Sequence, residues 1–300
     1  MKKPFVVAGI GELLWDVFPE GKRLGGAPVN FSYHCDQLGA DGYPVSAVGA
    51  DQLGAEIREV LREIGVDDRY IAVNAHPTGT VQVTLENGKP TYEICENVAW
   101  DHIPFTGKTE ELAQRADAVC FGSLAQRSFA SRAAIHGFLD WMKPDALKIF
   151  DVNLRQTYFS QASVMASLEL CNILKLSDEE LPVLAEMFGI EGSVEERLES
   201  LRERFGIRLI AYTRGPDGSL LLAGDEADDH PGCPGKAINS VGAGDSFTAA
   251  LCMGLLNGRS LADINEHANR VGTFVCTQDS ATPVLPRELV AAATAPCLVR

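Results

Sequence analysis

Short apolar runs of strand length alternate with longer amphipathic segments along most of the chain. Alternating strands and helices are typical of a mostly parallel sheet covered by helices on both faces, so the pattern predicts an α/β fold, a three-layer αβα sandwich. The predicted strands are Phe5–Gly9, Pro44–Val48, Ala118–Gly122, Lys148–Asp151, Ile173–Leu176, Leu209–Tyr212 and Ser219–Ala223. The predicted helices include Ala27–Leu38, Ala55–Ile64, Ser131–Met142, Ser193–Phe205 and Ser246–Asn257.

One region follows a different pattern. Residues 80–85 and 91–95 alternate between apolar and polar side chains around Asn87-Gly88, a dipeptide typical of tight hairpin turns. We predict a small β-sheet, formed by about residues 12–24 and 78–103, inserted into a single domain that spans residues 1–300. It would cover the substrate site as a lid. The alternative is an ordinary hairpin at the sheet edge.

Composition narrows the class of partner. The chain has 26 basic and 41 acidic residues, a formal net charge of −15, which argues against nucleic acid or an anionic membrane. An anionic small molecule stays possible, because a local pocket can oppose the global charge. The eight cysteines show no metal-binding spacing, so we expect a reduced, cytoplasmic protein. Glu12 and Asp16 interrupt the N-terminal apolar run, which favours a buried strand over a signal peptide.

The most informative motif is V-G-A-G-D-S-F-T-A-A at residues 241–250. Glycines that precede a helix let a ligand approach the backbone, and the unpaired N–H groups of the first helical turn attract anions such as phosphate. Asp245 adds a carboxylate that would repel phosphate. We interpret it as a base that takes a proton from an incoming hydroxyl. The alternative is a tight turn with Asp245 as the helix cap.

A second glycine-rich bend, G-G-A-P-V-N, lies at residues 25–30. Pro28 suits the first turn of a helix, which places Asn30 in that turn. The amide of Asn30 can both donate to and accept from sugar hydroxyls, and Asp16 can accept from two adjacent hydroxyls. Helix capping and a solvated Asp16 are the structural alternative.

Two further segments follow predicted strands. Asp151-Val152-Asn153-Leu154-Arg155 lies at the carboxyl end of a strand, where open α/β sheets place their ligands. Arg155 would hold phosphate or a substrate oxygen, or else form a surface salt bridge. The turn Thr213–Ser219 joins two strands and is a candidate for binding a nucleotide.

Two familiar nucleotide motifs are incomplete. Gly9-Ile10-Gly11 begins like a dinucleotide-binding fingerprint, but Leu14 occupies the third glycine position. Gly107-Lys108-Thr109 resembles the end of a P-loop, but His102 stands where the first glycine belongs. A dehydrogenase is therefore disfavoured.

Taken in order, the motifs resemble those of the ribokinase-like (PfkB) carbohydrate kinases, and within them the fructokinases. The resemblance extends from about Gly9 to Pro283. It rests on G-G-A-P-V-N, on A-V-G-A-D-Q-L-G at residues 47–54, on D-V-N-L-R at 151–155, on E-N-V-A-W-D at 96–101, and above all on V-G-A-G-D-S-F.

The resemblance implies phosphoryl transfer from ATP to a primary hydroxyl of a sugar. It makes Asp245 the base and the amides of Gly242, Ala243 and Gly244 the anion hole. The positions that match sugar-facing residues of the family are Asp16, Gly26, Asn30 and Arg155.

The nucleotide side follows from the same resemblance. Thr213, Gly215 and Gly218 match a nucleotide loop, and Asn269 matches a position near adenine. Glu180 matches a glutamate tied to the hydration shell of Mg²⁺.

Three positions depart from the family pattern. Ser177 replaces an asparagine three residues before Glu180, which affects the expected hydration network of Mg²⁺. Asn239 replaces an aspartate that helps bind K⁺, so activation by a monovalent cation is expected to be weak or absent. Ser280 replaces a common glycine.

Several sugars fit the implied chemistry. Fructose is the leading candidate, and 2-keto-3-deoxygluconate, ribose and nucleosides are alternatives. Arg155 would suit the carboxylate of a sugar acid. A non-catalytic sugar sensor is the alternative outside enzymes. Because lids of the family often pair between subunits, we expect a homodimer.

Overall fold

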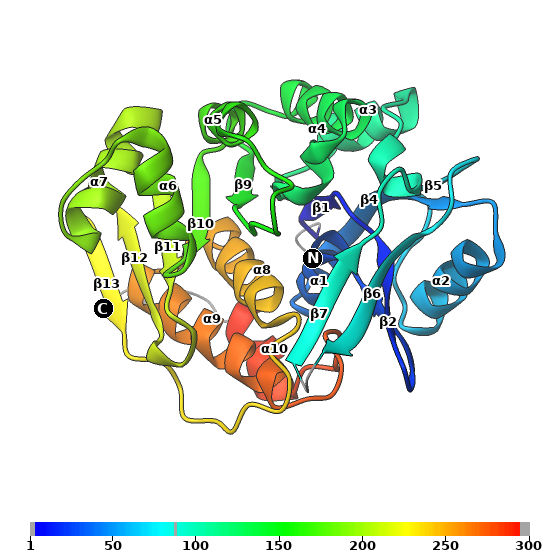
Figure 1. Ribbon diagram of the computed structural model, residues 1–300. Coiled ribbons are helices and arrows are strands. Elements are labelled where there is room, and N and C mark those ends of the chain that lie inside the picture. The colour runs from blue at the N-terminus through cyan, green and yellow to red at the C-terminus, as the bar shows by residue number, and fades with distance from the viewer. Residues whose placement is uncertain (1–3, 87–88, 295–300) are drawn as a thin grey trace.

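A large mixed sheet forms the centre of the molecule (Figure 1). The computed structural model describes residues 4–86 and 89–294. Six parallel pairings join the strands from β11 to β5, and β12 and β13 are added antiparallel at one edge. The nine strands in spatial order are β13 (Glu226–His230), β12 (Ser219–Ala223), β11 (Leu209–Thr213), β10 (Ile173–Ser177), β9 (Leu147–Asp151), β8 (Ala118–Phe121), β1 (Val6–Ile10), β4 (Asp41–Gly49) and β5 (Ile71–Asn74).

Helices cover both faces of this sheet, because its central strands are apolar on both sides. In β1, for example, Val6, Ala8 and Ile10 pack into one hydrophobic core and Val7 into the other. The first core includes side chains from α3 (Gly107–Arg115), α4 (Phe129–Trp141), α5 (Gln161–Leu170), α6 (Glu180–Phe188) and α7 (Val194–Phe205). The second includes side chains from α1 (Ala27–Gln37), α8 (Ala243–Leu256), α9 (Leu261–Cys276) and α10 (Arg287–Thr294).

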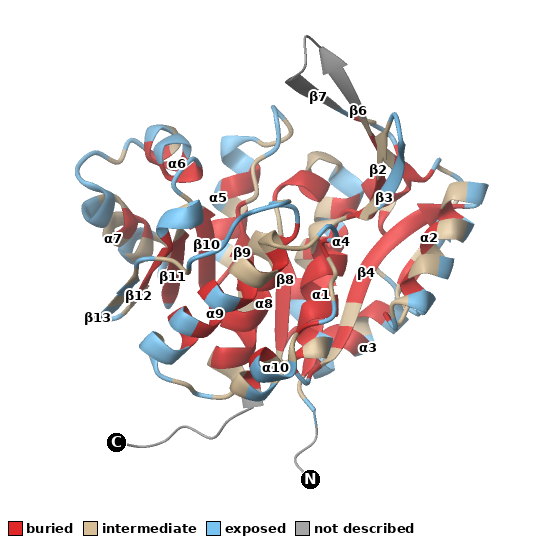
Figure 2. Ribbon diagram, turned by 90° about the horizontal axis from the view of Figure 1, so that it is seen from below, coloured by how far each residue is buried: buried red, intermediate tan, exposed pale blue. Residues whose placement is uncertain are grey.

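A second, four-stranded sheet projects from the layers of the large one (Figure 2). Its spatial order is β3 (Gly21–Gly25), β2 (Leu14–Phe18), β6 (Gly79–Glu86) and β7 (Lys89–Ile94). The pair β2–β6 is parallel and the other two pairs are antiparallel. Trp15 of β2 packs into a hydrophobic cluster with Val29 of α1 and Ile57 of α2 (Gln52–Glu63). The predicted turn at Asn87-Gly88 lies outside the described residues.

Short 3₁₀ helices form parts of the connections between these elements. They are η1 (Ala99–His102), η2 (Leu124–Arg127) and η3 (Gly215–Asp217). The first follows the small sheet, the second follows β8, and the third lies in the predicted nucleotide loop.

The predicted αβα sandwich is confirmed, and two details of the prediction need correction. Helix α8 begins at Ala243 rather than Ser246, because Gly242 takes a left-handed conformation (φ 81°) and is itself the helix cap. The alternative that Asp245 caps the helix is therefore wrong. The edge strand β13 was not predicted, because its sequence E-A-D-D-H is largely polar and its pairing with β12 is made by the backbone.

The close packing of α1 on β1 generates a stability prediction. A Cβ atom at Gly9 would lie 2.3 Å from the backbone oxygen of Pro28, so Gly9→Ala must push α1 away from the sheet. We expect a loss of roughly 1–3 kcal/mol in the free energy of unfolding, measured by urea denaturation. Gly107→Ala is the matched control, because a Cβ there meets open space. Equal stability of the two variants would contradict this account.

Candidate active site

Part of the predicted site lies where the strand order of the large sheet reverses. From β1 the chain continues to β4 on one side, and it returns to β8 on the other. Such switch points leave a crevice beyond the carboxyl ends of the strands, where ligands bind. Here Glu12 follows β1, Gly122 follows β8 and Asp151 ends β9, and together with Asn153 and Asp245 they line a narrow cavity of about 10 Å³. That volume suits about one water molecule and is too small for a sugar.

The N-terminus of α8 supplies the predicted anion-binding backbone. A Cβ at Gly242 would lie 2.7 Å from the Cβ of Ala281, so close packing and the left-handed φ both require glycine. The first-turn amides lack intrahelical partners, which suits them to an anion. Among the amides of Gly242, Ala243 and Gly244, that of Ala243 already makes a long hydrogen bond, 3.3 Å from the oxygen of Ser240. Asp245 lies in this same turn.

The second glycine-rich bend meets the first. Gly26 caps α1 with φ 130°, and a Cβ there would lie 2.5 Å from the oxygen of Glu12. This tight bend directs Asn30, which is only 3% exposed, toward α8. The side-chain amide of Asn30 donates to Oδ2 of Asp245 at 2.8 Å. Asn30 was predicted to face the sugar, and the structure shows that one of its N–H groups holds the predicted base.

The surroundings of Asp245 change its proton affinity. Burial raises its pKa from the ordinary 3.8 to about 7, and the nearby carboxylate of Asp151 acts in the same direction. The hydrogen bond from Asn30 and the ammonium of Lys175 oppose that rise. A carboxylate that titrates near neutral pH is well matched to general-base chemistry.

Behind Asp245 lies a buried ion pair that the sequence analysis did not identify. Lys175 on β10 is in register with Asp151 on β9, and its Nζ donates to Oδ1 of Asp151 at 3.0 Å. The hydroxyl of Thr248 lies 3.2 Å from Oδ2 of the same carboxylate. A Cβ at Gly244 would lie 3.2 Å from the lysine Nζ, so this glycine leaves room for the ammonium. A lysine inside the apolar strand I-L-K-L-S was the available signal.

The predicted sugar side is assembled from three segments. Asp16 lies on β2, and a Cβ at Gly25 would lie 2.7 Å from its Oδ2, so the double glycine makes space for this carboxylate. Burial raises the pKa of Asp16, and the guanidinium of Arg155 opposes that rise. Arg155 acts in the same way on Glu12, a buried residue not predicted for the site, whose Oε1 accepts from the amide of Ala27 at 3.3 Å.

Glu180 connects two loops at the edge of the site. Its Oε1 accepts from the amide of Leu154 at 2.9 Å and its Oε2 accepts from the amide of Ser177 at 2.8 Å. Within residues 4–86 and 89–294, no group of three or more His, Cys, Asp or Glu side chains is arranged to hold a metal ion. With both oxygens already hydrogen-bonded, Glu180 fits a water-mediated role toward a metal better than direct ligation.

The predicted nucleotide residues lie together near β11 and β12, toward the β13 edge of the sheet. Asn269 on α9 donates to the hydroxyl of Ser219 at 2.8 Å, and Ser219 directly follows Gly218. Gly215 and Gly218 both have positive φ, 54° and 82°, which shapes the turn after Thr213. The side chain of Asn239, proposed for K⁺, accepts from the amide of Val241 at 3.0 Å. Its role with a cation stays a prediction.

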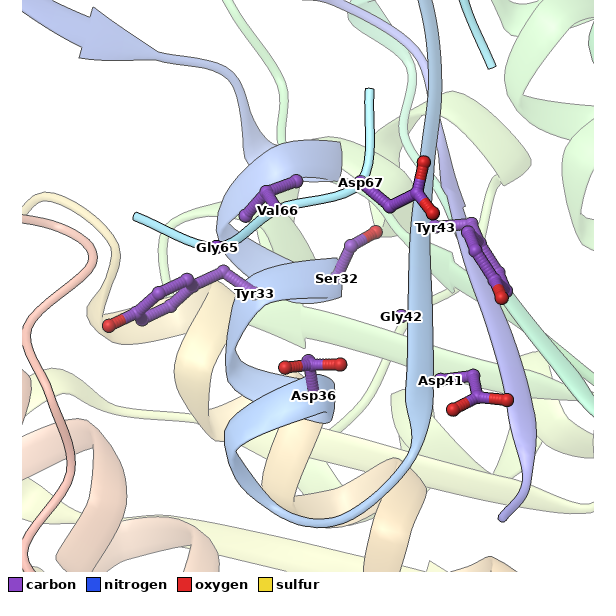
Figure 3. Close-up of a pocket in the computed structure, with 9 residues that line it drawn as sticks. All are labelled: Ser32, Tyr33, Asp36, Asp41, Gly42, Tyr43, Gly65, Val66 and Asp67. Atoms are coloured by element: carbon purple, nitrogen blue, oxygen red, sulfur yellow. The ribbon is translucent and has the colours of Figure 1, made fainter. Parts of the chain in front are cut away.

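A separate cavity of about 240 Å³ lies between α1 and the start of β4 (Figure 3). It contains none of the predicted site residues. Three carboxylates, those of Asp36, Asp41 and Asp67, line it, so it is unsuited to a phosphate group.

Comparison with known proteins agrees with this geometry. The model of the pfkB family carbohydrate kinases matches residues 11–288. The chain belongs to this family. It is therefore a sugar kinase, and the resemblance seen in its motifs is confirmed.

Two relatives, one of them with a crystal structure, illustrate the match. A sugar kinase of Pyrococcus horikoshii is 31% identical over 94% of this chain and 93% of its own length. A crystal structure of that uncharacterized kinase in complex with ATP has a TM-score of 0.81 at 27% identity, covering 96% of this chain and 99% of the other. Fructokinase-1 of Oryza sativa is 26% identical over 95% of both chains.

None of the helices formed by the described residues has the length and apolar character that crossing a bilayer requires.

The titration of Asp245 predicts a pH dependence. Only the ionised carboxylate accepts a proton, so kcat/KM should fall below pH 7 and be roughly 100-fold lower at pH 5 than at pH 8. In Asn30→Ala the hydrogen bond that lowers the pKa is lost, so the acidic limb should move to higher pH. Initial rates over this pH range, at saturating nucleotide, measure both effects. An unchanged limb in Asn30→Ala would contradict the assignment.

Proposed function

We propose that this protein is an ATP-dependent fructokinase, which transfers the γ-phosphoryl group of ATP to a primary hydroxyl of fructose. The observation that supports this most directly is the placement of Asp245. A carboxylate with a pKa near 7 lies in the first turn of α8, beside amides suited to an anion and at the rim of the strand crevice.

In this proposal Asp245 need not ionise the sugar hydroxyl in advance. It accepts the proton as the new O–P bond forms, while Asn30 holds its second oxygen in place. The amides of Gly242 and Gly244 stabilise charge on the transferring phosphoryl group, and they share that task with the weakly engaged amide of Ala243. Asp16 and Arg155, which lie near each other, orient the sugar. The small sheet acts as a lid that excludes water, the competing acceptor.

Mg²⁺, when bound, would supply positive charge that neutralises the nucleotide phosphates. Glu180 is the residue we assign to its hydration shell, since both carboxylate oxygens are placed by backbone amides and stay available to water. The nucleotide would bind at the turn that joins β11 to β12, through Thr213, Gly215, Gly218 and the nearby Asn269. Weak or absent activation by K⁺, expected from Asn239, and assembly into a homodimer stay predictions from the family resemblance.

Fructose is favoured because fructokinases recur among the relatives of this chain. The rival 2-keto-3-deoxygluconate has one specific observation in its favour. Arg155 is exposed beside Asp16 and is available to a sugar carboxylate. Ribose and nucleosides are weaker alternatives. A non-catalytic sensor would have no need for a buried asparagine directed at Asp245.

The variant Asp245→Asn tests the base. It keeps the shape of the site and the partner for Asn30 but removes the proton acceptor, so kcat should fall by about 10²–10⁴-fold with little change in sugar affinity.

The variant Asp245→Asn should also be more stable than the wild type at high pH. The folded protein binds the Asp245 proton more tightly than the unfolded chain does, so wild-type stability is lost as pH rises from 3.8 to about 7. The asparagine avoids that loss, up to about 4 kcal/mol at pH 8 and close to none at pH 4.

Asp263→Asn is the matched control for this experiment. Asp263 occupies the corresponding position in the first turn of α9, where it is exposed and bonded to Ser260. It should keep wild-type kcat and lack the pH-dependent gain in unfolding free energy. Wild-type turnover by Asp245→Asn would show that Asp245 is not the base.

A rate panel tests the sugar. We expect the highest kcat/KM with fructose among fructose, 2-keto-3-deoxygluconate, ribose and adenosine at fixed MgATP. If 2-keto-3-deoxygluconate is preferred, Arg155→Gln should abolish that preference, because only the sugar acid needs the positive charge. Absence of phosphorylation with every sugar, at saturating ATP, would contradict the proposed function.

A further inference from the structure

The guanidinium of Arg127, at the end of η2, lies where three segments meet. Its Nε donates to Oδ1 of Asp101 at 2.8 Å, and its Nη2 donates to Oδ2 of Asp101 at 2.9 Å. The same Nη2 donates to the backbone oxygen of Cys95 at 2.6 Å. Cys95 belongs to the lid root, the segment of residues 95–101 that follows β7. The side chain is only 8% exposed, and that of Asp101 only 5%. A buried, two-pronged ion pair therefore fixes the end of η2 to the lid root.

Aromatic rings flank the same guanidinium. Its central carbon lies 4.1 Å from the ring centroid of Trp100 and 4.6 Å from that of Tyr158. Trp100 belongs to η1, which follows the lid, whereas Tyr158 belongs to the loop that follows β9 and carries Arg155. A planar guanidinium can stack on rings and bind a carboxylate with two hydrogen bonds, which an ammonium cannot.

Tyr158 makes a second connection between the same segments. Its hydroxyl lies 3.2 Å from the backbone oxygen of Ile94 and 2.9 Å from Oε1 of Glu96, and either oxygen can accept a hydrogen bond from it. Ile94 ends β7, the last strand of the lid. The amide of Tyr158 donates to the oxygen of Arg155 at 3.0 Å, so this turn fixes the ring relative to Arg155. The loop and the lid root are thus joined through one aromatic side chain.

Backbone strain is concentrated on this connection. Among the described residues other than glycine, positive φ values occur at Asn97 (53°), Asn153 (43°) and Gln156 (49°). Asn97 belongs to the lid root, and the other two flank Arg155 in sequence. Asparagine adopts such φ values at little cost, whereas glutamine holds them only where surrounding contacts enforce them. At the start of η2, Ser123 adds one of these contacts by donating to the oxygen of Asn153 at 3.2 Å.

We propose that Arg127 and Tyr158 form a joint that positions the Arg155 loop and the lid relative to each other, and so determine how the sugar is held. The inference rests on the proposed function, because it assigns Arg155 and the lid to the sugar. Arg127 is a positioning residue in this proposal. It acts through Tyr158 and the lid root and touches neither sugar nor nucleotide.

Two variants test the joint at different strengths. Tyr158→Phe removes only the hydroxyl and should raise the KM for the sugar about 3–10-fold. Arg127→Lys keeps the charge but loses the stacking and the paired hydrogen bonds, so kcat/KM for the sugar should fall by roughly 10–100-fold. In both variants the KM for ATP should stay within about twofold of wild type, because the proposed nucleotide loop is the turn that joins β11 to β12, away from the joint. A general loss of protein stability would not change the kinetic constants for the sugar while leaving the KM for ATP unchanged.

Tyr70→Phe is the matched control. Tyr70 also lies beside an arginine, and its hydroxyl accepts from Nη2 of Arg115 at 3.1 Å, but it precedes β5 and lies outside the joint. This variant should leave both KM values unchanged.

Amide hydrogen exchange provides a readout that does not depend on activity. In Tyr158→Phe, exchange should quicken on both sides of the joint, at Cys95 in the lid root and at Leu154 in the loop. Faster exchange confined to the neighbourhood of residue 158 would overturn the joint. Coupled exchange with an unchanged sugar KM would overturn its positioning role. If the wild type phosphorylates no sugar, the proposed function fails, and the exchange result alone then decides whether the joint exists.

Discussion

The contact on which the site depends is the hydrogen bond from Asn30 to Asp245. It joins the first turns of α1 and α8, two helices whose bonded residues are 215 positions apart in the chain. The contact requires both helices to pack closely on the same face of the sheet. Glycines allow that packing, since a Cβ at Gly9, Gly26 or Gly42 would lie within 2.5 Å of a backbone oxygen. Gly26, which belongs to the G-G-A-P-V-N motif, therefore serves the fold whatever its role toward a ligand.

The charges around this contact are unusual for a protein interior. Three acidic side chains, those of Glu12, Asp151 and Asp245, line one small cavity, and burial raises the pKa of each. Lys175 is the buried cation that pairs with this group. Carboxylates held together in this way reduce stability when ionised, and such arrangements are tolerated where they serve chemistry. For the proposed role of Asp245 the raised pKa is useful, because a base that titrates near neutral pH both accepts and releases a proton readily.

Two connections hold the halves of the site in place. Glu180 ties the loop after β9 to the end of β10, on the side of the proposed nucleotide loop. On the other side, Arg127 ties the segment after β8 to the root of the small sheet. Both use buried carboxylate or guanidinium groups whose hydrogen bonds are directional, so they fix geometry as well as distance. The loop that carries Arg155 lies between them and is held from both sides.

Local patterns in the sequence were enough for the layered fold, the two glycine bends and the presence of Asp245 beside a glycine turn at a helix N-terminus. Each of these depends on residues close together in the chain, where periodicity and backbone sterics act directly. The start of α8 was placed three residues late, because the left-handed conformation of Gly242 is supported by its packing on Ala281. Strand β13 was not identified, because only its backbone pairing makes it a strand.

Tertiary structure alone decided which distant groups meet. The register of β9 and β10 places Lys175 opposite Asp151, and the packing of α9 on β12 brings Asn269 to Ser219. The pKa of Asp245 was equally beyond the sequence, since it arises from burial and from charges supplied by other segments. Such contacts depend on strand order and on the crossing of distant elements, which no local pattern encodes.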